Sequence, residues 1–84
     1  MKKNLNRELL ADVAEKLIFH LQTRKDVQNI DLMNLSGFCR NCLSKWYANS
    51  AAKRDIDIDY EEIRELVYGM PYKDWKDKYQ TEAT

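Results

Sequence analysis

Apolar side chains recur at helical spacing along the chain, and the clearest series lies in residues 5–24. Steps of three and four residues place them on a single face of an α-helix. This apolar stripe consists of Leu10, Val13, Ala14, Leu17 and Leu21. Asn4 or Asn6 can cap the start of the helix. Phe19 lies nearly opposite the stripe, where an aromatic is either an ordinary surface side chain or an intermolecular contact.

Two further helices are predicted to meet at a glycine corner. Asp26 is the expected N-cap of the first, which ends at Gly37 because glycine adopts the left-handed C-terminal conformation at little cost. Ser36 is the expected N-cap of the next helix, over about 38–53. The apolar stripe of that helix is predicted to be Cys39, Cys42, Leu43 and Trp46. This pattern favours both cysteines as small buried hydrophobes.

The last third of the chain predicts two short helices after an extended connector at 55–58. A helix at about 60–68 stops at Gly69, and Pro71 suits the first turn of a final helix because it lacks a backbone donor. One side of the final helix carries Tyr72, Trp75 and Tyr79. We expect that side to dock on the core. The sequence therefore predicts an all-α fold, a compact array of about five short helices.

The chain length and the net charge limit the domain organisation and the kinds of partner that this sequence allows. The 84 residues predict a single domain, 1–84, with disordered ends at about 1–4 and 81–84. A core this small usually needs a metal, a disulfide or a second subunit, so we expect a homodimer. The 14 basic and 14 acidic residues cancel, which argues against a nucleic-acid partner. No signal-peptide segment or apolar run of about 20 residues occurs, so we expect a cytoplasmic protein with no membrane partner.

Cys39 and Cys42 form a Cys-x-x-Cys pair with three open interpretations. Buried core thiols need no further partner. A structural zinc site needs four ligands, so a zinc or iron site requires His20 with a carboxylate such as Asp31, or a second cysteine pair from another subunit. A redox pair has this spacing at a helix start, although the βαβ pattern of thioredoxin-like proteins is absent. No cofactor is certain from the sequence.

Three stretches of the chain carry a family resemblance. They are residues 26–35 (DVQNIDLMNL), 37–47 (GFCRNCLSKWY) and 67–72 (VYGMPY), with Trp75 shortly after. Together they resemble a family of small, mainly proteobacterial proteins, the domain of unknown function 1244, and the likeness extends from the first predicted helix to about Gln80. The resemblance implies a helical domain of the bacterial cytosol. It implies no activity.

The family-like stretches are rich in polar side chains that a structural core does not require. The candidates for one common polar surface are Asp26, Gln28, Asn29, Asp31, Arg40, Asn41, Tyr68 and Tyr72. The other interpretation is a buried polar network that fixes the helix corners and a subunit interface, since buried polar groups must all be satisfied.

The sequence favours a non-catalytic protein-interaction or regulatory module, with metal or redox sensitivity at Cys39 and Cys42. The alternative is a small thiol-dependent enzyme with a pocket lined by the 26–31 and 39–42 segments. Buried, inert thiols would favour the module, whereas a reactive thiol beside a cleft would favour the enzyme. No catalytic residue is assigned.

Overall fold

A computed structural model describes residues 6–81 of the chain. The helices are α1 (Arg7–Thr23), α2 (Asn29–Ser36), α3 (Arg40–Lys53), α4 (Tyr60–Tyr68) and α5 (Tyr72–Tyr79). No strand occurs in this part of the chain, so the predicted all-α fold with five helices is confirmed. Residues 1–4 and 82–84 of the predicted disordered ends lie outside the described residues, whereas Thr81 donates its backbone N–H to Gln28 Oε1 (2.9 Å).

Three helix ends follow the local signals that predicted them. Asn6 caps α1, because its side-chain oxygen accepts from the backbone N–H groups of Glu8 (2.8 Å) and Leu9 (3.2 Å). Gly37 ends α2 and Gly69 ends α4, with φ angles of +80° and +78°. This left-handed conformation strains residues that carry a Cβ and leaves glycine unstrained.

Two predicted N-caps are wrong. Asp26 bonds Arg24 through both carboxylate oxygens (3.0 and 2.9 Å), and α2 begins after Gln28 instead. Ser36 belongs to the last turn of α2, where its hydroxyl donates to a carbonyl one turn earlier, and Cys39 is the N-cap of α3. In both cases a neighbouring partner occupies the polar side chain that was expected to cap.

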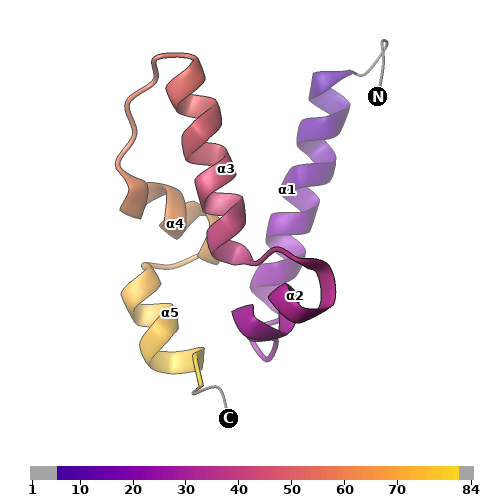
Figure 1. The fold of residues 1–84 in the computed structure, drawn as a ribbon, viewed down its shortest axis with the longest axis vertical. Coiled ribbons are helices and arrows are strands. Elements are labelled where there is room, and N and C mark those ends of the chain that lie inside the picture. The colour runs from indigo at the N-terminus through magenta and orange to yellow at the C-terminus, as the bar shows by residue number, and fades with distance from the viewer. Residues whose placement is uncertain (1–5, 82–84) are drawn as a thin grey trace.

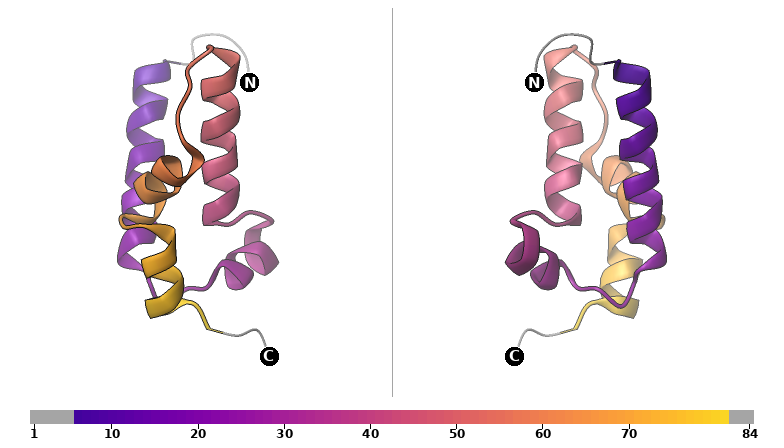
Figure 2. Two further views of the ribbon diagram at one scale, coloured as in Figure 1. Left: turned by 90° about the vertical axis from the view of Figure 1, so that its left-hand side faces the viewer. Right: turned by 90° about the vertical axis from the view of Figure 1, so that its right-hand side faces the viewer.

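The main core forms where α4 contacts α3 and α5 (Figures 1 and 2). Ile63, Val67 and Tyr68 of α4 and Trp75 of α5 are each at most 2% exposed. The Trp75 ring lies edge-on to Tyr68, with 5.1 Å between centroids, and 6.1 Å from the Tyr79 ring. The predicted docking side of the last helix is therefore confirmed.

A smaller core lies where α1, α2 and the start of α3 meet. It consists of Leu21, Leu32 and Cys39, with Val27, Cys42 and Leu43 packed against it. The predicted stripe of α3 is wrong at Trp46, which is 56% exposed and contacts Phe38 with 5.9 Å between ring centroids. The helix α2 has 8 residues and lies beside the start of α3 (Figure 1). Because α2 covers only the first turn of α3, Trp46, one turn further along the same stripe, stays exposed.

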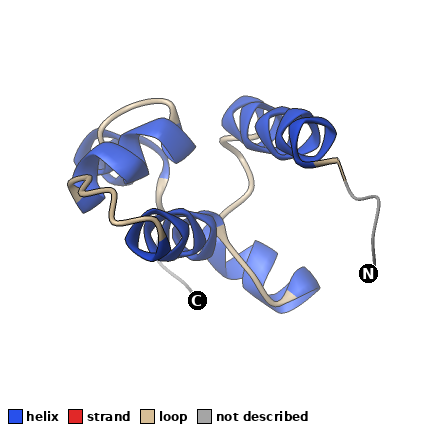
Figure 3. Cartoon of the chain, turned by 90° about the horizontal axis from the view of Figure 1, so that it is seen from above, coloured by secondary structure: helices blue, strands red, loops and turns tan. Residues whose placement is uncertain are grey.

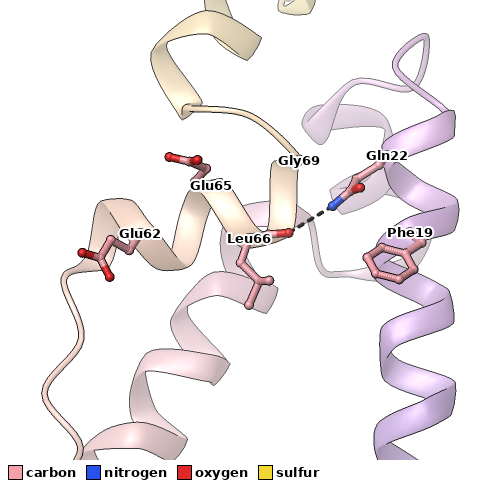
Figure 4. Close-up of a pocket in the computed structure, with 6 residues that line it drawn as sticks. All are labelled: Phe19, Gln22, Glu62, Glu65, Leu66 and Gly69. Carbon is pink, nitrogen blue, oxygen red and sulfur yellow. Dashed lines mark hydrogen bonds between the residues drawn. The ribbon is translucent and has the colours of Figure 1, made fainter.

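The first turns of α1 stand apart from the other helices (Figures 1 and 3). Leu21 is the buried residue of α1, so the predicted stripe is helical but leaves Leu10 and Val13 exposed. Gln22 attaches the helix to the end of α4, where its Nε2 donates to the Leu66 carbonyl (3.0 Å; Figure 4) and to the Val67 carbonyl (3.2 Å). No helix of the described residues combines the length and the hydropathy that a membrane crossing requires.

Candidate functional site

Arg40, the first residue of α3, has its side chain inside the protein and is 1% exposed. Its guanidinium donates to the carbonyls of Arg24 (2.9 Å) and Leu21 (3.5 Å) at the end of α1, and to Asn29 Oδ1 (3.0 Å) in α2. It also lies 4.9 Å from the centroid of the Trp75 ring, within cation–π range. No ion pair involves Arg40 in the described part of the chain. Carbonyl oxygens and an aromatic face therefore balance this buried charge.

A chain of hydrogen bonds continues from Arg40 through Asn29, Tyr68 and Asn41. Asn29 Nδ2 donates to the Tyr68 hydroxyl (3.0 Å), which donates to Asn41 Oδ1 (2.8 Å). Asn29 Oδ1 also accepts from the backbone N–H of Arg40 (3.4 Å). A residue of α2 thus acts as the cap of α3, since the N-cap Cys39 makes no side-chain cap bond. These bonds fix the orientation of both carboxamides.

Burial sets the charge states of this hydrogen-bond chain. Desolvation raises the pKa of Tyr68 to about 12, and the hydrogen bond from Asn29 only partly opposes that rise. Desolvation also lowers the pKa of Arg40, yet a guanidinium stays charged near neutral pH. Tyr68 therefore keeps its proton at neutral pH and remains the donor to Asn41.

A cleft of about 300 Å³ lies beside this hydrogen-bond chain. It is lined by Gln28, Asn29, Ile30, Asn41, Tyr72, Gln80 and Thr81. These residues come from the start of α2, the first turn of α3, the start of α5 and the segment after α5. Gln28 joins two of these segments, because its Nε2 donates to the Tyr79 carbonyl (2.7 Å) and its Oε1 accepts from Thr81. The cleft is thus built from parts of the chain that are far apart in sequence.

The predicted polar surface divides into three groups. The residues that line the cleft are Gln28, Asn29, Asn41 and Tyr72. Arg40 and Tyr68 lie in the interior next to them, each 1% exposed. Asp26 pairs with Arg24, whose hydrogen bond lowers the pKa of that carboxyl, and Asp31 accepts from the Gln28 backbone N–H (3.0 Å). Some of the predicted residues thus form a polar surface and others form a buried polar network. The buried network supports the polar lining of the cleft.

The two cysteines lie together but outside the cleft. Their Sγ atoms are 3.8 Å apart and form no disulfide. Cys39 is 8% exposed, whereas Cys42 is half-buried and its Sγ lies 3.9 Å from Met33 Sδ. The pocket expected between the 26–31 and 39–42 segments exists, but neither sulfur lines it.

The structure adds no third ligand to the cysteine pair. His20 is exposed on α1. Within residues 6–81 no three side chains of His, Cys, Asp or Glu are grouped so as to hold a metal ion. The candidate set of Cys39, Cys42 and His20 is therefore not assembled in one chain.

A wider hollow of about 480 Å³ lies between α1 and α4 (Figure 4). It is lined by Phe19, Gln22, Glu62, Glu65, Leu66 and Gly69. The carboxylates of Glu62 and Glu65 point away from Phe19 and Gln22 (Figure 4). Because its polar groups do not converge, this hollow is a weaker candidate site than the cleft.

Sequence reasoning missed Gln22, Gln80 and Thr81. Gln22 had a usable signal, because a glutamine beside the apolar stripe of a helix is placed to bond the helix that covers the stripe. Gln80 and Thr81 had none, since only the folded chain brings them to the start of α2.

Comparison with known proteins places the chain in a family without a described activity. Residues 27–84 match the family described as "Protein of unknown function (DUF1244)". The matched range includes every residue of the cleft and leaves α1 outside it. No curated protein matches the chain. Because the match covers more than half of its residues, the chain belongs to the DUF1244 family.

Proposed function

We propose that this protein is a non-catalytic interaction module of the bacterial cytoplasm that works as a homodimer through α1. The exposed apolar side of α1 carries the proposal. Leu9, Leu10, Val13 and Leu17 are 64%, 48%, 65% and 38% exposed. Most of the stability of a helix in a protein comes from packing its amphipathic face, and these apolar side chains of α1 are not packed. Exposed apolar patches of this kind mark protein–protein contacts.

A groove continues this apolar surface toward α3 and α4. It has a volume of about 340 Å³ and is lined by Ala11, Ala14, Glu15, Ile18, Phe19, Tyr47 and Leu66. Phe19 is 52% exposed and Leu66 is 47% exposed, so both have apolar area left to bury. Phe19 lies on this side of α1, nearly opposite the stripe that contains Val13, so its role as an intermolecular contact is separate from the proposed dimer face.

The charges along α1 favour a second copy of the same chain as the occupant. The acidic residues of the helix are Glu8, Asp12 and Glu15, which lie between its first turn and its middle together with one base, Arg7. The second half carries Lys16 and His20, followed by Lys25 and by Arg24, whose charge is paired with Asp26. Two antiparallel copies that cross near Val13 set Asp12 of one copy near Lys16 of the other, whereas Glu8 and Glu15 lie on the side of Phe19, away from this contact. Parallel copies set like charges together, so the proposal is an antiparallel pair.

Sedimentation velocity of wild type, Val13→Glu and Val13→Leu tests the pairing. We expect dimers for wild type and Val13→Leu, and a folded monomer for Val13→Glu, because a carboxylate on the apolar face is costly to bury. Asp12→Lys should weaken the dimer, and adding Lys16→Asp should restore it. A monomeric wild type at high concentration, or a Val13→Glu dimer, would contradict the proposal.

Redox sensitivity at Cys39 and Cys42 is a second candidate, favoured by their separation of 3.8 Å. A small movement brings the sulfurs to the bonding distance of about 2 Å. Hydrogen peroxide would take two electrons and two protons from the thiols, giving one disulfide and two water molecules. Cys42 is the more exposed thiol and should react first. Mass spectrometry after peroxide should find two hydrogens lost in wild type, and retention of both would contradict the idea.

Two further hypotheses about the thiols have unequal support. A thiol-dependent enzyme is disfavoured because neither cysteine borders the cleft. A zinc or iron site made by one cysteine pair from each subunit stays a prediction, which native mass spectrometry of chelator-free protein would test.

A further inference from the structure

The cleft at Asn29 and Asn41 offers hydrogen-bond donors rather than acceptors. Asn41 Oδ1 is occupied by the Tyr68 hydroxyl, whereas no acceptor in the described part of the chain takes Asn41 Nδ2. Asn29 Oδ1 accepts twice from Arg40, and its Nδ2 keeps one of two hydrogens after bonding Tyr68. The Tyr72 hydroxyl donates to Gln80 Oε1 (3.5 Å), so the two N–H groups of the Gln80 amide are available to a ligand. The complement of this lining is a group that only accepts.

Buried groups strengthen these donors from the interior. The Arg40 guanidinium bonds the oxygen of Asn29, and the Tyr68 hydroxyl bonds the oxygen of Asn41. Donation to an amide oxygen polarises the amide, so its N–H groups become stronger donors. Both supporting side chains are 1% exposed, which holds the two carboxamides in place. The charge of Arg40 meets no carboxylate partner in the described residues.

We infer that this cleft binds a carboxylate group, carried by a small organic acid or by the C-terminus of a peptide. A single negative charge suits neutral donors beside one buried cation. Phosphate dianions are usually held by arginine or lysine, and the lining of the cleft has neither. Ile30 and the Tyr72 ring give the hydrocarbon part of the ligand an apolar surface. The volume of about 300 Å³ limits the bound part to a small group.

This site is independent of the proposed homodimer. Its residues belong to the family match, whereas α1 lies outside it. Loss of the dimer in Val13→Glu would leave the cleft unaltered, so the two proposals fail separately.

Titration of ¹⁵N-labelled protein with sodium benzoate, followed by NMR, tests the site. We expect saturable shifts of the side-chain amide signals of Asn29 and Asn41, and much weaker binding of benzamide, which lacks the charge. Asn41→Asp keeps an acceptor for Tyr68 but replaces the donor with a carboxylate. It should weaken benzoate binding by about tenfold or more. Asn49→Asp, an exposed position of α3 with the same change in charge, should leave binding unchanged.

A second variant and a peptide pair complete the experiment. Gln80→Glu places a negative charge at the exposed wall of the cleft and should also weaken benzoate binding. The tripeptide Gly-Gly-Phe, with a free or an amidated C-terminus, separates the two sources of carboxylate. Tighter binding of the free peptide than of benzoate assigns the site to a chain end, and weaker binding assigns it to small acids. Absence of saturable shifts with both carboxylates, equal binding of benzamide, or equal effects of Asn41→Asp and Asn49→Asp would overturn the inference.

Discussion

Large apolar side chains are buried around Trp75 but exposed along the first turns of α1. Val67, Tyr68 and Trp75 are each 1% exposed, and the polar groups beside them are joined in hydrogen bonds. Along α1, Leu9 and Val13 are 64% and 65% exposed. In the first region, α3, α4 and α5 converge on Trp75, and Asn29 of α2 bonds Tyr68 beside it. In the second region, the other helices cover only the last turns of α1. The stability of its first turns therefore depends on what binds them.

The largest expected effect separates the two tryptophans. Trp75→Ala removes a fully buried ring that contacts Arg40 and Tyr68, and should cost about 3–5 kcal/mol of unfolding free energy. Trp46→Ala, at a ring 56% exposed, should cost less than about 1 kcal/mol. Urea denaturation followed by circular dichroism measures both. Similar losses would show that the two regions are equally packed.

The next effect concerns alkaline pH. The pKa of Tyr68 is raised from 10.0 to about 12 in the folded protein, so the neutral side chain stabilises the fold fully below pH 10. That contribution, roughly 3 kcal/mol, should disappear as pH rises from 10 through 12. Tyr68→Phe should be less stable at neutral pH, because Asn29 and Asn41 lose a partner, but should show a flatter pH profile above 10.

Tyr47→Phe is the control for this pH dependence, since Tyr47 is 43% exposed. Its stability should follow wild type across the same pH range. A wild-type profile that matches Tyr68→Phe would remove Tyr68 as the cause.

A smaller effect tests the contact between α1 and the end of α4. A Cβ at Gly69 would lie 2.8 Å from Gln22 Cδ, whereas a Cβ at Gly37 meets nothing within 4 Å. Both glycines have positive φ, so either change to alanine should cost about 1–2 kcal/mol. Gly69→Ala should cost about 1 kcal/mol more, because it displaces Gln22 from the carbonyls of α4. Thermal or urea unfolding should find this excess abolished in a Gln22→Ala background.

Local signals in the sequence predicted the helices well. Asn6, Gly37 and Gly69 act on their own or adjacent residues, so their effect can be read without the fold. Asp26 and Ser36 failed as caps because a neighbour in each case offers a competing bond. Helical period identified the docking face of α5 but not the main buried face of α3, whose fully buried residues are Arg40, Ser44 and Ala51. It also gave no information on whether another element covers a face.

The candidate site was only half predictable. The polar residues near Asn29 and Asn41 stand out by composition, but the burial of Arg40 depends on carbonyls of α1 that are 16 and 19 residues away. Asn29 caps α3 from a different helix, and no local pattern encodes such a bond. The cleft itself needs Gln80 and Thr81, which reach the start of α2 only after α5 has docked.

The contrasting environments of the two tryptophans also give the molecule two optical reporters. Trp75 is 1% exposed and lies beside Arg40, so we expect its fluorescence to be blue-shifted and shielded from a dissolved quencher such as iodide. Trp46 is 56% exposed, so we expect its emission to be red-shifted and readily quenched. Spectra with and without iodide should therefore separate the signal of the aromatic core from that of the exposed surface of α3. Changes in the aromatic core and changes at the surface of α3 can be followed in the same unlabelled sample.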